Sequence, residues 1–156
     1  MNNKSVIIID FGSQYTQLIT RRVRENNVYS EIFPHDISTE EIVNYNPNAI
    51  ILSGGPASVY DEGSYKLNPE IFDLNVPILG ICYGLQLLVQ NFGGEIKSKN
   101  RGEYGLAKIV TDTSDNLFSG IKENSSVWMS HGDEVDSIHR HWEIIGKSDN
   151  DVVAAV

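Results

Sequence analysis

The sequence predicts an α/β fold: an open, mostly parallel sheet with helices on both faces, followed by a smaller antiparallel sheet. In the first half, continuous apolar runs alternate with segments of helical spacing. Such runs are typical of strands buried on both faces, and their alternation with helices implies right-handed crossovers. After Gly94 the pattern changes to short strands without long helices between them, which predicts the antiparallel part.

The chain of 156 residues fits one domain with a sizeable core, and we expect that domain to span 1–156. The expected parallel strands lie at 5–10, 28–33, 49–52 and 78–81. The expected helices or helical turns lie at 15–25, 38–45, 69–74 and 85–92. The expected strands of the second part lie at 95–98, 106–111, 125–129, 143–147 and 152–156.

The first two helices have recognisable start signals. Ser13 is the expected N-cap of the first helix. Spacing predicts that Leu18, Ile19 and Val23 of this helix face the core. The second helix begins with a Ser-x-x-Glu capping box at 38–41, in which side chain and backbone satisfy each other's free groups.

Composition narrows the classes of function. A net charge of −9 argues against a nucleic-acid partner, because phosphate binding needs a basic face. A single cysteine excludes an internal disulfide and suits a reducing compartment. We see neither a signal-peptide pattern nor an apolar run long enough for a membrane, so we expect a cytoplasmic protein without a membrane partner. His139 and His141 lack further ligands nearby in sequence, and we expect no metal site.

The strongest functional signal is Cys82, which stands between an expected strand and an expected helix. Gly80 and Gly84 flank it in a Gly-x-Cys-x-Gly pattern, the nucleophile elbow with sulfur as the nucleophile. The glycines permit a sharp turn, and the start of the helix favours a thiolate. The alternative is a buried, inert cysteine at a strand end. The paired glycines and the strand-to-helix context favour the nucleophile.

Two groups of backbone N–H donors are expected beside this thiol. The N–H of Tyr83 follows the nucleophile, where a tetrahedral oxyanion would form. Ligands bind beyond the carboxyl ends of parallel strands, so the loops at 11–14 and 53–56 should converge on Cys82. Gly54 and Gly55 would then supply a second donor. The alternative for this second loop is an ordinary turn.

The stretches 80–86 and 53–56 resemble class I (triad-type) glutamine amidotransferase domains, whose sheet is flavodoxin-like. Three more stretches, at 10–19, 101–105 and 127–133, resemble one branch of this family, and the resemblance covers essentially the whole chain. In that branch an ATP-pyrophosphatase (synthetase) domain or subunit takes the ammonia and aminates xanthosine 5′-monophosphate.

The resemblance implies hydrolysis of glutamine through a cysteine thioester, with Cys82 as nucleophile. It implies backbone oxyanion donors at Tyr83 and Gly55. The glutamine is expected to be held by Gln86 and, chiefly through backbone, by Ser130 and His131. No cofactor is implied for this domain, whereas ATP and magnesium are implied for the synthetase partner.

One departure from the family pattern affects these expectations. The family completes its triad with a His-x-Glu pair that this sequence lacks, so we expect the domain to be C-terminally incomplete and inactive alone. His131 matches the glutamine pocket rather than that pair. Two alternatives remain open: the glutaminase domain of another class I amidotransferase, and a non-catalytic binding module that retains the elbow.

Overall fold

The computed structural model describes residues 5–156, and at 99–101 it describes the backbone alone. The chain divides into two compact units, Met1–Asn91 and Phe92–Val156, and each is considered by itself. Among the described residues, no helix combines the length and the apolar character that crossing a membrane requires.

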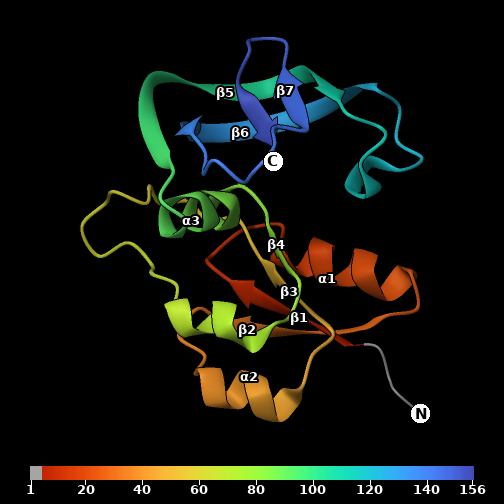
Figure 1. Cartoon of the computed structure of the whole chain (residues 1–156), viewed down its shortest axis with the longest axis vertical. Helices are drawn as coiled ribbons and strands as arrows, with labels where there is room; N and C mark the ends of the chain where they lie inside the picture. The colour runs from red at the N-terminus through yellow and green to blue at the C-terminus, as the bar shows by residue number, and fades with distance from the viewer. Residues whose placement is uncertain (1–4) are drawn as a thin grey trace. The chain divides into compact units, whose positions relative to one another are not determined.

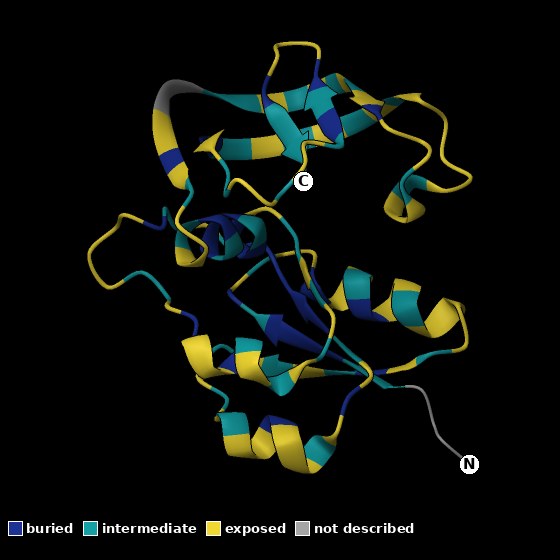
Figure 2. Ribbon diagram, viewed as in Figure 1, coloured by how far each residue is buried: buried dark blue, intermediate teal, exposed yellow. Residues whose placement is uncertain are grey.

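The first unit is built on a parallel sheet, which confirms the predicted fold class (Figure 1). Its strands lie side by side in the order β2-β1-β3-β4 and run parallel throughout. Their bounds are β1 Ser5–Asp10, β2 Tyr29–Pro34, β3 Ala49–Leu52 and β4 Ile78–Gly80. The centre of the sheet forms much of the core, and Figure 2 shows its middle strands mostly in dark blue, the colour of buried residues.

Helices cover both faces of this sheet. Their bounds are α1 Thr16–Glu25, α2 Thr39–Tyr45, the 3-10 helix η1 Pro69–Leu74, and α3 Tyr83–Asn91. The chain moves one way from β1 to β2 and then the other way from β2, past β1, to β3, so right-handed crossovers place α1 and α2 on opposite faces (Figure 1). The predicted capping box is confirmed: Ser38 accepts from the Glu41 N–H, and the Glu41 carboxylate accepts from the Ser38 N–H.

Two predictions for α1 are wrong. Leu18 is 44% exposed, and the buried positions of this helix are Thr16 and Thr20. Threonine is tolerated there because the Thr16 hydroxyl donates to Asp10 Oδ1 (2.7 Å) and the Thr20 hydroxyl to the Thr16 carbonyl (2.9 Å). Ser13 is not the N-cap, which is Tyr15; its hydroxyl instead accepts from the Tyr15 N–H within the preceding loop.

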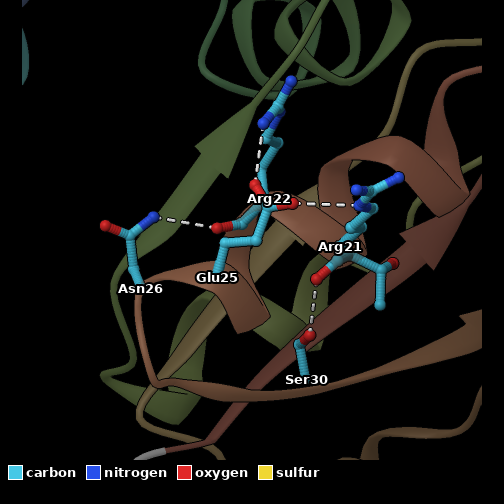
Figure 3. A network of polar contacts seen from close by, with 6 residues as sticks. Arg21, Arg22, Glu25, Asn26 and Ser30 are labelled. Carbon is cyan, nitrogen blue, oxygen red and sulfur yellow. Dashed lines mark hydrogen bonds and ion pairs between the residues drawn. The ribbon is translucent and has the colours of Figure 1, made fainter.

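The C-terminal end of α1 carries the polar network that is drawn in Figure 3. Arg21 and Arg22 pair with Glu25 on the surface, and such exposed pairs contribute little to stability. Ser30 of β2 is fully buried, and its hydroxyl donates to the Thr20 carbonyl (3.0 Å). The Ser30 hydroxyl, together with the Arg24 guanidinium that donates to the Ser30 carbonyl oxygen, therefore ties this end of α1 to the sheet.

The second unit is an antiparallel sheet in the order β6-β5-β7-β8. Its elements are β5 Glu95–Thr111, the 3-10 helix η2 Asn116–Phe118, β6 Asn124–Ser137, β7 Gly146–Ser148 and β8 Val153–Ala155. The strands predicted at 95–98 and 106–111 are parts of the single strand β5, because an irregularity in the ladder interrupts the pattern without ending the strand. The strand predicted at 143–147 is wrong for 143–145.

Candidate active site

Cys82 lies in the sharp turn between β4 and α3, as the sequence predicts, and its side chain is exposed. Its φ of +52° falls in the left-handed region, which costs energy for any residue other than glycine. A Cβ added at Gly80 would lie 2.6 Å from the Gly84 carbonyl carbon, and one at Gly84 would collide with the Leu52 carbonyl oxygen. Only glycine therefore fits at these two positions, two residues before and two residues after the cysteine.

Backbone hydrogen bonds fasten this elbow to the end of β3. The Ile81 N–H donates to the Leu52 carbonyl (3.0 Å), and the Gly84 N–H lies 3.0 Å from the Ser53 carbonyl. The thiol consequently stands at the first turn of α3, where free N–H groups and the helix dipole favour an anion. This environment suits a thiolate nucleophile.

The buried Tyr83 side chain also holds this turn in place. It is 1% exposed, its hydroxyl donates to the Tyr65 carbonyl (2.7 Å), and its ring lies 5.6 Å from that of Phe11. Burial raises the pKa of Tyr83, so the phenol remains a neutral hydrogen-bond donor. With its side chain fixed in this way, the position of the Tyr83 backbone N–H beside Cys82 is also fixed.

The loop after β3 meets the elbow and the loop after β1, which confirms the predicted convergence. The Ser53 hydroxyl accepts from the Phe11 N–H (2.9 Å) and donates to the Gly54 carbonyl (2.8 Å). A Cβ at Gly54 would lie 3.5 Å from Cys82 Cβ, and one at Gly55 would lie 2.6 Å from the Phe11 carbonyl oxygen. A larger residue would therefore crowd its neighbours at Gly55, whereas at Gly54 a Cβ would make ordinary contacts.

Sequence reasoning missed Ser53 and Asp10 as organisers of these loops. Ser53 is fully buried, and Asp10 Oδ1 accepts from both the Gly12 N–H (2.9 Å) and the Thr16 hydroxyl. A signal was present, because each is a polar residue at the carboxyl end of an apolar strand. Polar residues placed there commonly hold the loop that follows.

The structure places the remaining predicted residues in two different units. Gln86 is buried on α3, one turn after Cys82, and its N–H donates to the Cys82 carbonyl (3.0 Å). Ser130 and His131 lie on β6 of the second unit. Ser130 is exposed, whereas the His131 side chain is only 17% exposed and pairs across the sheet with Glu103.

Glu103 is a buried carboxylate that sequence reasoning did not single out. Burial alone would raise its pKa, but hydrogen bonds from Asn150 (2.8 Å) and Ser148 (2.9 Å), together with the nearby His131, hold the pKa of Glu103 below its usual value. The carboxylate is therefore stabilised in its charged form inside the second unit.

Comparisons with known proteins point to one family. The model of the family Glutamine amidotransferase class-I matches residues 7–156. The glutamine-hydrolyzing GMP synthase of Staphylococcus aureus (strain JH9) is 52% identical over 151 residues, which are 97% of this chain and 29% of that protein. The chain thus spans less than a third of the length of this relative.

Solved structures show the same fold. A Thermoplasma acidophilum protein assigned as a GMP synthase subunit matches with a TM-score of 0.85 and 29% identity, over 98% of this chain and 77% of that one. A glutamine amidotransferase from Thermotoga maritima matches with a TM-score of 0.74 and 22% identity, over 98% of this chain and 70% of that one. At 22% identity, the similarity to the Thermotoga maritima protein shows a shared fold and nothing more.

The close approach at Gly84 gives a test of the elbow. We expect Gly84→Ala to lower the free energy of unfolding by about 3 kcal/mol, because the new methyl group would meet the Leu52 backbone. Gly63→Ala is the matched control: its φ of +78° strains alanine, but nothing lies within 4 Å. That strain should cost about 1 kcal/mol. Urea denaturation measures both, and equal losses would contradict the steric argument.

The depressed pKa of Glu103 predicts how stability depends on pH. A carboxyl with a lower pKa in the folded than in the unfolded chain stabilises the fold above its unfolded pKa and loses that contribution as pH falls through its folded pKa. Glu103→Gln should therefore destabilise the protein at neutral pH. In this variant the free energy of unfolding should also fall less steeply as the pH drops below 4.5, the ordinary pKa of a glutamate. Denaturation curves across this range test it, with the exposed Glu95→Gln as control. Parallel curves for the wild type and Glu103→Gln would rule it out.

Proposed function

Since the chain belongs to the class-I glutamine amidotransferase family, we propose that it is the glutamine-hydrolysing part of a GMP synthase. The single observation that carries this proposal is the elbow: an exposed thiol in a left-handed backbone conformation, at the start of a helix and between two glycines that nothing larger can replace. That geometry fits a nucleophile for acyl transfer.

In the proposed reaction the Cys82 thiolate attacks the carboxamide carbon of glutamine. The resulting oxyanion is stabilised by the backbone N–H groups of Tyr83 and Gly55, which are preorganised by the buried contacts around them. Collapse of this intermediate releases ammonia and leaves a glutamyl thioester on Cys82. Water then hydrolyses the thioester to glutamate and regenerates the thiol.

Each half of this reaction moves a proton. The departing ammonia must gain one, and the attacking water must lose one, which is work for a general acid–base group. Cys82, Tyr83 and Gly55 cannot supply it. His131 is a poor candidate, because both of its ring nitrogens lie against oxygen acceptors in its own unit. The resemblance to the family assigns these proton transfers to the His-x-Glu pair that completes its triad.

The resemblance to the family proposes Gln86, Ser130 and His131 as the residues that hold the substrate. Gln86 lies one turn along α3 from Cys82 and offers a buried side-chain amide. Ser130 and His131 would bind glutamine chiefly through their backbone. The ammonia would pass to an ATP- and magnesium-dependent synthetase domain or subunit, which converts xanthosine 5′-monophosphate to GMP in purine biosynthesis. The similarity to a glutamine-hydrolyzing GMP synthase supports this acceptor.

The nucleophile is tested by labelling. In the protein as its gene encodes it in full, an electrophilic ketone analogue of glutamine should modify Cys82 much faster than iodoacetamide does, because glutamine binding adds to thiol reactivity. Mass spectrometry locates the adduct. Cys82→Ser should abolish ammonia release from glutamine while leaving the melting temperature close to that of the wild type.

Two results would contradict this assignment. One is an adduct at a residue other than the chain's single cysteine. The other is ammonia release that continues at the wild-type rate in Cys82→Ser. If glutamine is hydrolysed but added ammonia does not replace glutamine in GMP formation, the glutaminase part of the proposal stands and its acceptor is wrong.

The oxyanion donor at Gly55 makes a separate prediction. A methyl group there would press on the Phe11 carbonyl oxygen and displace the loop, so Gly55→Ala should lower kcat by about 10²–10³ with a smaller change in KM. Gly54→Ala serves as the comparison, because its methyl group would make only ordinary contacts with Ser13 and Cys82. A change confined to KM in Gly55→Ala would assign this loop to substrate binding instead.

A further inference from the structure

The β5–β6 ladder is interrupted beside the segment that carries Ser130 and His131. Ser98 pairs with Asp133 and Glu103 with His131, so 99–102 of β5 stand opposite Gly132 alone. Such bulges often re-aim residues next to functional sites. Gly102 lies so close to the His131 carbonyl that a Cβ would collide with it. Ser130, His131 and Asp133 keep their ladder partners, whereas Gly132 has none, so contacts outside the ladder help to fix the backbone around this glycine.

The His131 ring supplies one of those contacts. Its Nδ1–H donates to the Asp133 carbonyl oxygen (2.9 Å), which spans the glycine between the two residues. Its Nε2 lies 3.3 Å from Glu103 Oε2 on the neighbouring strand. The ring thus joins Glu103 to the backbone on the far side of Gly132.

Glu103 is in turn held from the opposite side. Its Oε1 accepts hydrogen bonds from the Ser148 hydroxyl (2.9 Å) and the Asn150 side-chain amide (2.8 Å). Ser148 ends β7 and is itself buried, so this anchor belongs to the interior of the unit. A continuous polar chain therefore runs from β7 through Glu103 and His131 to the Asp133 backbone.

Burial makes the Glu103–His131 contact important. The Glu103 side chain is 10% exposed, and its Oε2 accepts no well-aligned hydrogen bond within the part of the chain that the structure describes. A buried carboxylate oxygen is costly without a partner. Because Nδ1–H already donates to the Asp133 carbonyl oxygen, the contact with Glu103 is attractive in the imidazolium form of the ring, in which Nε2 also carries a proton. Replacing either residue would therefore release the ring and the backbone that it holds.

We propose that Glu103 is a positioning residue for glutamine binding, which acts by holding the His131 ring and, through it, the backbone of 130–133. This inference rests on the proposed function, in which Ser130 and His131 bind glutamine chiefly through backbone. Glu103 then controls the affinity for glutamine rather than the reactivity of Cys82. Its loss should raise KM, because a small displacement of binding groups weakens binding strongly.

The test uses the protein as its gene encodes it in full. Glu103→Ala should raise KM for glutamine about tenfold with kcat changed by less than about threefold. The rate at which iodoacetamide alkylates Cys82 should stay unchanged, since that reagent uses no glutamine pocket. Glu95→Ala, an exposed carboxylate on the same strand, is the matched control and should leave KM at its wild-type value.

A second measurement separates this inference from the proposed function. Backbone amide signals of Ser130 and Gly132 in heteronuclear NMR spectra should shift in Glu103→Ala and not in Glu95→Ala. If the wild type shows no glutamine-dependent labelling of Cys82, the proposed function fails and the link to glutamine fails with it. The amide signals then still decide whether Glu103 positions the segment. Shifted amides with unchanged KM would overturn the role in binding.

His131→Ala covers the case in which Glu103→Ala does not fold. In that variant Glu103 keeps its hydrogen bonds from Ser148 and Asn150, but the ring that bridges to the Asp133 carbonyl is lost. It should raise KM as much as Glu103→Ala does, and the double variant should be no worse than either single one. An unchanged KM in His131→Ala, or fully additive effects, would refute the proposal.

Discussion

The candidate active site depends on how closely α3 approaches the end of β3. The absence of a side chain at Gly84 lets its backbone lie against the Leu52 carbonyl, where any Cβ would collide. Only with this contact can the turn close and Cys82 adopt its φ of +52°. The strain at the cysteine is thus held in place by packing at its neighbours, and the exposure of the thiol follows from both.

The parallel sheet and the elbow could be predicted because both depend on local patterns: apolar runs, and glycines at fixed spacing around Cys82. The resemblance to class I glutamine amidotransferases, drawn from the same stretches, is confirmed by the family match. The buried threonines of α1 could not be predicted. Thr16 and Thr20 are buried because their hydroxyls find partners in the fold, and hydrophobic spacing gives no sign of such partners.

The second unit was less predictable for a different reason. Its long strand β5 contains an irregular register, and Glu103 meets a hydroxyl donor, Ser148, that stands 45 positions away in the sequence. No periodicity marks such a contact. The binding roles of Ser130 and His131 were inferred from resemblance alone. The structure adds that the Ser130 side chain is exposed and that the His131 ring lies between the Glu103 carboxylate and the Asp133 carbonyl.

The hydrogen bonds from Ile81 and Gly84 to the end of β3 also bear on the motions of the molecule. The amide hydrogens of these two residues can exchange with solvent only when the turn separates from the strand. Separation would expose the buried Leu52 and Ser53, so opening of the turn and fraying of the sheet should form one cooperative event. Fluctuations that keep the sheet intact therefore keep the thiol in its reactive setting.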